Sequence, residues 1–155
     1  MKSNSFSTLD GAGLKIAVVA ARFNAELTDA LLADCVEALM SAKVAPEDIT
    51  SVRVPGSFEL PIAAATLAAQ GRFDAVICLG VIIKGETKHD HYIADAVSNG
   101  LTRVALDHHI PVIFGVLTTE DKAQAEARAL GGRKKGYEAG MSAIETIRAL
   151  DASHS

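Results

Sequence analysis

Four short, almost continuous apolar runs alternate along the chain with longer stretches in which apolar side chains recur every three or four residues. A continuous apolar run is typical of a strand buried on both faces, and the longer spacing is typical of a helix with one buried side. The runs predict strands at Lys15–Ala21, Ile49–Val54, Asp74–Ile83 and Pro111–Leu117. The periodic stretches predict helices at about Ala25–Ala42, Phe58–Ala69, Lys88–Asp107, Thr119–Leu130 and Lys134–Leu150.

This alternation predicts an α/β fold, a three-layer sandwich with a central four-stranded parallel sheet, flavodoxin-like in arrangement. Ligands of such folds bind just outside the carboxyl ends of the strands. Residues 1–13 carry neither period, so we expect them to form an N-terminal arm in front of a single domain at 14–155.

Composition narrows the class of protein. A chain of 155 residues, 49% of them hydrophobic, is long enough for one domain with a substantial core. The net charge of −4 argues against a general nucleic-acid binder, which would carry a basic excess. No apolar run approaches membrane-spanning length and the polar N-terminus lacks the apolar segment of a secretory signal, so we expect no membrane association and a cytoplasmic location. The two cysteines, Cys35 and Cys78, have no CxxC neighbour and are expected to be reduced core thiols.

The segment Gly80–Gly100 contains the most informative junction between a strand and a helix. The apolar strand gives way to a polar corner, Glu86-Thr87, and a periodic helix follows. Thr87 is predicted to cap that helix, with Asp90 as the reciprocal acid of a capping box. Because the free N–H groups at a helix start suit an anion, this corner suits a phosphorylated substrate.

His89 is the histidine best placed for chemistry. It lies four residues before Ile93 on the apolar side of the helix, so the spacing predicts an inward direction beside the anion corner. His89 and His91 cannot chelate one metal ion, because side chains two residues apart on a helix point to nearly opposite sides. We therefore expect no metal site, and we place His91 on the polar face. A catalytic and a structural role for His89 both stay open from the residues alone.

Other candidate residues follow the remaining strands. Phe23 lies just beyond the first predicted strand. Its ring could cover the edge of the core or contact a ligand, and the residues alone leave both roles open. Ser57 and Glu59 lie at the start of the helix predicted after the second strand. At such a position a serine can cap the helix and a glutamate interacts favourably with the helix dipole, so structure alone could explain both. Arg128 closes the fourth helix, where a cation compensates the dipole. Neither a Walker A motif nor GxGxxG is present, so nucleotide-phosphate sites of those kinds are not expected.

Five spaced motifs together resemble the lumazine synthase family. They are RFN at Arg22–Asn24, VPGSFELP at Val54–Pro61, LGVIIKGETKH at Leu79–His89, PVIFGVLTTED at Pro111–Asp121, and KG.EA at Lys135–Ala139 with Arg128 before it. The match keeps its order from about Lys15 to Leu150. The resemblance implies a transferase that uses no metal and no organic cofactor. This enzyme would condense 5-amino-6-ribitylamino-pyrimidinedione with 3,4-dihydroxy-2-butanone 4-phosphate to form 6,7-dimethyl-8-ribityllumazine, releasing phosphate and water, in the penultimate step of riboflavin biosynthesis.

The same resemblance implies roles for individual residues. Those that would hold the pyrimidinedione ring and its ribityl chain are Phe23, Ser57, Phe58, Glu59, Val81, Ile82 and Ile83. Those that would bind the phosphate of the butanone are Glu86, Thr87 and Arg128. His89 would donate and accept protons. Phe114 would enter the pocket of a neighbouring subunit, with Lys135 near it.

Three positions depart from the pattern that is common in the family. His91 replaces a usual carboxylate, Lys84 stands where arginine is frequent, and the segment Leu130–Gly136 is short and lacks the usual asparagine before Lys135. The first departure leaves the acid partner of His89 open, and the third leaves the placement of Lys135 open.

Assembly is also implied by the resemblance. The family forms homopentamers, twelve of which pack into a hollow icosahedral 60-mer in some members, and an association with riboflavin synthase is a further expected partnership. The short segment before Lys135 is compatible with a capsid, and pentamer and 60-mer both stay open. Two other classes of protein also stay open: a non-catalytic lumazine- or flavin-binding protein, and a shell protein whose main task is assembly.

Overall fold

The computed structural model describes residues 9–85, 89–132 and 134–152, which form four strands and five α-helices. The strands are β1 (Ile16–Ala21), β2 (Ile49–Val54), β3 (Ala75–Ile83) and β4 (Val112–Thr119). The helices are α1 (Ala25–Ser41), α2 (Leu60–Ala68), α3 (Asp90–His108), α4 (Lys122–Ala129) and α5 (Lys135–Ala152), with short 3-10 turns η1 (Pro46–Asp48) and η2 (Ser57–Glu59). No helix in these ranges is both long and apolar enough to cross a membrane.

The strands pair in parallel in the order β2-β1-β3-β4. β1 and β3 are central and buried along their whole length, which explains their unbroken apolar runs. β2 and β4 form the edges and carry exposed positions. Ile16 of β1 is level with Ile49 of β2 and with Ala75 of β3, so the carboxyl ends of these strands lie at one edge of the sheet.

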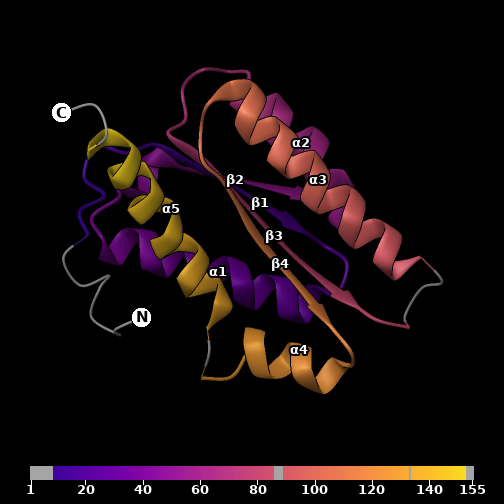
Figure 1. Ribbon diagram of the computed structural model, residues 1–155. Coiled ribbons are helices and arrows are strands. Elements are labelled where there is room, and N and C mark those ends of the chain that lie inside the picture. The colour runs from indigo at the N-terminus through magenta and orange to yellow at the C-terminus, as the bar shows by residue number, and fades with distance from the viewer. Residues whose placement is uncertain (1–8, 86–88, 133, 153–155) are drawn as a thin grey trace.

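Helices cover both faces of this sheet (Figure 1). α2 and α3 lie on one face and α1 and α5 on the other, while α4 lies at the end where β4 leaves the sheet. Successive side chains of β1 therefore lie in two different hydrophobic cores. Ile16 and Val18 pack with α1 and α5, and Ala17 and Val19 pack with α2 and α3. The predicted three-layer α/β sandwich, with its four-stranded parallel sheet and flavodoxin-like arrangement, is confirmed.

Two helices start later than predicted. α3 begins at Asp90, with His89 in the N-cap position, while Thr87 and Lys88, on which the predicted capping box and helix start fall, lie outside the described residues. α4 begins at Lys122 instead of Thr119, because pairing of Ile83 with Thr119 keeps β4 extended. Asp121 caps α4 through a 2.8 Å hydrogen bond in which its Oδ1 accepts from the Gln124 N–H.

The helix predicted at Phe58–Ala69 is divided. Ser57–Glu59 form a 3-10 turn and α2 follows from Leu60. Gly56 occupies the N-cap position of that turn, so the prediction that Ser57 caps a helix is also wrong.

The last part of the predicted N-terminal arm packs against the domain. Leu9 adds to the core under α1 and α5. Arg148 of α5 donates two hydrogen bonds to the carbonyl oxygen of Asp10, at 2.9 Å from Nε and 2.8 Å from Nη2. Residues 1–8 of that arm lie outside the described residues.

Both cysteines are buried and form no disulfide. Burial raises the pKa of the Cys35 thiol and of the Cys78 thiol to about 12 each, because desolvation disfavours the thiolate. Each thiol is therefore uncharged at neutral pH and a poor nucleophile, which fits packing roles in the two cores.

α1 and α5 approach closely at two glycines of α5. A Cβ at Gly136 would overlap the backbone carbonyl of Leu31, and one at Gly140 would lie 2.9 Å from the carbonyl oxygen of Cys35. Backbone atoms cannot move aside as a flexible side chain can. The close contact between α1 and α5 therefore requires residues without a Cβ at these two positions.

We expect Gly136→Ala to lower the free energy of unfolding by about 1–3 kcal/mol, because the added methyl group forces α5 away from α1. Gly132→Ala is the control, since a Cβ there meets nothing within 4 Å. Urea unfolding followed by circular dichroism measures both. A Gly136→Ala protein as stable as the control would contradict the close packing.

Candidate active site

A pocket of about 350 Å³ opens at the carboxyl ends of the central strands, between η2 and the start of α3. This volume is in the range of sites for small organic ligands. Most of its lining is apolar, with a few polar groups from η2. The described lining residues are Phe23, Pro55, Gly56, Ser57, Phe58, Glu59, Val81, Ile82, Ile83 and Ile93.

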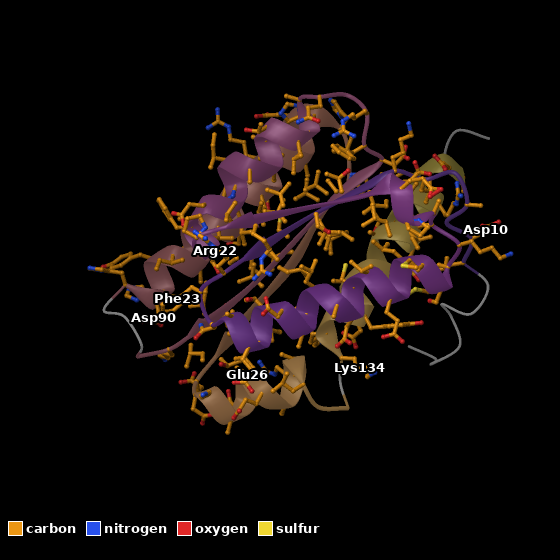
Figure 2. All side chains as sticks on the ribbon, turned by 180° about the vertical axis from the view of Figure 1, so that it is seen from behind. Asp10, Arg22, Phe23, Glu26, Asp90 and Lys134 are labelled. Carbon is orange, nitrogen blue, oxygen red and sulfur yellow. The ribbon has the colours of Figure 1, made fainter. Side chains whose placement is uncertain are left out.

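Phe23 contributes an aromatic ring from the corner between β1 and α1. Its side chain faces the pocket, and the residue is 55% exposed, so the ring does not cover the core of this chain. Its backbone is fixed, because the Phe23 N–H donates to the Pro55 carbonyl at 3.0 Å. Figure 2 shows Phe23 at the same end of the molecule as Asp90, the first residue of α3. A flat apolar or heteroaromatic ligand could stack on this ring.

Asn24 sets the direction of the chain after Phe23. Its φ of 64° is in the left-handed region, which asparagine tolerates better than most residues. Its Nδ2 donates a 3.2 Å hydrogen bond to the carbonyl oxygen of Val81. The corner that carries Phe23 is thereby linked to β3, which forms the floor of the pocket.

The turn η2 supplies the polar groups of the pocket. Ser57 is nearly buried and lies so close to β3 that a Cβ at Gly80 would be 2.5 Å from its Oγ. Glu59 accepts a 2.8 Å hydrogen bond from the Gly56 N–H through Oε1, which fixes its carboxylate. Phe58 is 62% exposed and adds a second aromatic surface. A hydroxyl and a carboxylate on this wall can bind a chain of alcohol groups.

The floor of the pocket is the end of β3. Val81, Ile82 and Ile83 are buried, and Ile93 of α3 faces them across the pocket. Ile93 was placed on the apolar side of the helix by its spacing, but sequence reasoning did not identify it as a pocket residue. Its position one turn into the helix that follows β3 was the available indication.

His89 lies directly before α3 and is not among the described lining residues of the pocket. Its carbonyl oxygen accepts from the Ile93 N–H at 3.0 Å, which couples it to the lining. The residue is exposed in the single chain, so the prediction of an inward-facing histidine is wrong in that respect. Its ring centroid is 6.0 Å from that of Tyr92, while His91, also exposed, is 4.0 Å from Tyr92. Glu86 and Thr87, the predicted anion corner, lie outside the described residues.

Phe114 and Lys135 lie elsewhere in the chain. Together they line a second pocket of about 220 Å³ between β4 and α5, on the other face of the sheet. Lys135 Nζ is 2.9 Å from the Glu138 carboxylate there, and Phe114 is 45% exposed. A single chain therefore does not bring these two residues to the pocket of Phe23.

Arg128 lies in the last turn of α4, with a half-buried side chain. It is not among the described lining residues of the Phe23 pocket. No cluster of three or more His, Cys, Asp or Glu side chains suited to a metal ion occurs in the described part of the chain.

Comparison with known proteins gives a consistent match. The family model described as 6,7-dimethyl-8-ribityllumazine synthase matches residues 13–151. A protein of that name from Kineococcus radiotolerans is 52% identical over 145 residues, which is 92% of this chain and 88% of the relative. Another of that name from Thermococcus kodakarensis is 46% identical over 135 residues, which is 87% of this chain and 85% of the relative.

We expect Asn24→Ala to be less stable than Asn24→Gly by about 1–2 kcal/mol. Both lose the hydrogen bond to Val81, but only glycine adopts a positive φ without strain. The matched pair Lys43→Ala and Lys43→Gly, at φ 77° and away from the pocket, measures the backbone effect alone. Urea unfolding compares the four proteins. Equal stability of the two Asn24 variants would show that the left-handed corner is not held in solution.

Proposed function

Because the chain belongs to the 6,7-dimethyl-8-ribityllumazine synthase family, a family of transferases in riboflavin biosynthesis, we propose that it catalyses the lumazine-forming condensation itself. The substrates are 5-amino-6-ribitylamino-pyrimidinedione and 3,4-dihydroxy-2-butanone 4-phosphate, and the products are 6,7-dimethyl-8-ribityllumazine, phosphate and water. The observation that carries this proposal is the exposed Phe23 ring beside an apolar pocket with a serine and a carboxylate on one wall.

The pyrimidinedione fits the larger pocket by its chemistry. Its flat ring stacks on Phe23, and the apolar end of β3, Val81–Ile83, excludes water below it. The ribityl hydroxyls are bound by Ser57 Oγ and by the Glu59 carboxylate, beside Phe58. Since Glu59 Oε1 already accepts from the Gly56 N–H, the other carboxylate oxygen remains for the ligand.

The phosphate of the butanone binds at the start of α3. Free N–H groups at a helix N-terminus attract an anion, and Glu86 and Thr87 lie three to four residues before this helix in the sequence. Arg128 of α4 supplies a guanidinium, which suits phosphate through charge and paired donors. The roles of Glu86, Thr87 and Arg128 rest on the matching family motifs.

The reaction needs several proton transfers. The amine of the pyrimidine attacks the ketone, and water leaves as the imine forms. Phosphate is then eliminated together with a proton from the neighbouring carbon, and the resulting enol tautomerises to a second carbonyl. The ribitylamino nitrogen attacks this carbonyl and a second water leaves, which closes the ring. A histidine exchanges protons near neutral pH, and His89 directly precedes α3, where its carbonyl accepts from the N–H of the pocket residue Ile93. Holding both substrates in contact supplies much of the acceleration.

The site is completed by a second subunit in this proposal. Phe114 and Lys135 belong to the family motifs but line a different pocket of the same chain, so they can reach the Phe23 pocket only from a neighbour. We propose a homopentamer as the unit, with both a free pentamer and a 60-mer compatible with the short segment before Lys135. Cytoplasmic location and association with riboflavin synthase complete the proposal.

The direct test is to mix pure protein with both substrates and follow lumazine fluorescence after exhaustive dialysis against EDTA. We expect full activity without added metal, because the proposed steps use only protein groups and proximity. Binding of the lumazine without turnover would replace the proposal with a non-catalytic carrier. Activity that returns only with zinc or magnesium would contradict the metal-free mechanism.

His89→Ala should slow turnover by roughly 10²-fold or less, because proximity of the substrates remains after the proton carrier is lost. His91→Ala is the matched control and should change turnover little, since this exposed ring packs on Tyr92. Steady-state kinetics compare the two variants. A larger loss from His91→Ala would refute the assignment of His89.

Mixed oligomers test the shared site. The Phe23→Ala and Phe114→Ala proteins should each have low activity. After joint refolding of equal amounts, about a quarter of the sites should combine an intact Phe23 from one subunit with an intact Phe114 from its neighbour and regain activity. The separately refolded proteins, mixed afterwards, are the control. Failure of joint refolding to raise activity above this control would place Phe114 outside the site.

A further inference from the structure

Arg53 of β2 makes polar contacts on both sides of the corner that carries Phe23, although no family motif includes it. Its Nε donates to the carbonyl oxygen of Ala20 and its Nη2 to that of Ala21, at 3.2 Å each. These are the last two residues of β1. The guanidinium thus holds the strand at the point where it leaves the sheet.

The same guanidinium reaches the first turns of α1. Its Nη2 is 3.3 Å from Thr28 Oγ1, and its Nη1 donates to Asp29 Oδ1 at 2.7 Å. Arg53 therefore joins the end of β1 to the start of α1, and residues 22–24 form the loop between them. A planar group with five donors can serve four acceptors at once, which a lysine ammonium cannot do in the same geometry.

The backbone after Arg53 continues the same support. The Val54 carbonyl accepts from the Arg22 N–H at 2.7 Å, and the Pro55 carbonyl accepts from the Phe23 N–H at 3.0 Å. Arg53 and Val54 at the end of β2, and Pro55 directly after it, thus hold this corner. The chain then turns directly into η2, the polar wall of the pocket.

The Phe23 ring needs such support because little else directs it. More than half of the residue is exposed, so core packing does not fix the ring. Its direction depends on the backbone conformation of the corner, where Asn24 already adopts a positive φ. An aromatic group that binds a ligand by stacking loses affinity when its ring is free to move.

We propose that Arg53 is a positioning residue for the pyrimidinedione, acting through Phe23. By closing the corner between β1 and α1, it holds the ring in the direction that stacks on the ligand. The ion pair with Asp29 is a minor part of this role, since Asp29 is 62% exposed and such pairs are weak in water. The inference rests on the proposed function, because that function gives the ring its ligand.

Arg148 provides a matched control. It also donates from Nε and Nη2 to a backbone carbonyl, that of Asp10, and also pairs with a carboxylate, that of Asp151. Its side chain is 38% exposed, against 32% for Arg53. Figure 2 shows Asp10 at the end of the molecule opposite Phe23. Arg148→Ala therefore removes a similar set of contacts far from the pocket.

The first experiment follows the ring without reference to activity. The chain contains no tryptophan, so Phe23→Trp introduces a single reporter. Time-resolved anisotropy should show at least a two-fold larger amplitude of fast indole motion when Arg53→Ala is added, and no change when Arg148→Ala is added. Arg53→Lys keeps the charge and should give an intermediate amplitude, and it replaces Arg53→Ala if that variant does not fold. Unchanged motion in both Arg53 variants would overturn the inference.

The second experiment uses kinetics with Phe23 intact. Arg53→Ala should raise the KM for the pyrimidinedione about five- to twenty-fold and change the KM for the butanone phosphate less than about two-fold. In a protein that already carries Phe23→Ala, Arg53→Ala should raise the KM for the pyrimidinedione little further. The effects of two substitutions are not additive when one residue acts through the other. Equal changes in both KM values, or fully additive losses, would show a merely structural role. A wild-type protein that makes no lumazine would instead refute the proposed function and leave the anisotropy result standing.

Discussion

The parallel register of β1 with its two neighbours is the constraint on which the site depends. Ala21, the end of β1, is level with Val54, the end of β2, and β3 continues beside them to Ile83. Three chain segments that are remote in sequence therefore leave the sheet at one edge. Phe23, the turn η2 and the end of β3 become walls of a single pocket for this reason. A shift of one residue in either pairing would reverse the faces and separate them.

The pattern of apolar residues was sufficient to predict the fold, because both central strands are buried on two faces and so have unbroken apolar runs. Helix starts were less predictable. A helix was predicted to start at about Thr119, yet pairing of Thr119 with Ile83 holds it in β4, and Asp121 caps α4 instead. Long-range pairing overrides local preference at such boundaries.

The candidate site was predictable where chemistry sits at the end of a strand. Phe23 lies two residues after β1 and Ser57 three residues after β2, and the structure brings both to the pocket. Arg53 could not be found in this way, because its importance comes from side-chain contacts with β1 and α1 and not from its place in a motif. Phe114 could be connected with the site only by resemblance, since the fold of one chain places it in another pocket. Contacts between segments that are remote in sequence, or between subunits, produce no pattern among neighbouring residues of the sequence.

The central position of β1 also has a consequence for synthesis of the protein. Of the four strands of this sheet β1 is translated first, and Ile16 pairs with Ile49 and with Ala75, which follow later in the chain. At a translation rate of about 5–20 residues per second, the strand waits roughly 3–12 s for its second neighbour. During that interval the edge of IAVVAA that later pairs with β3 has no partner strand. A strand that is fully buried in the finished protein therefore spends part of translation with an unpaired edge, and an unpaired apolar edge can pair with another chain.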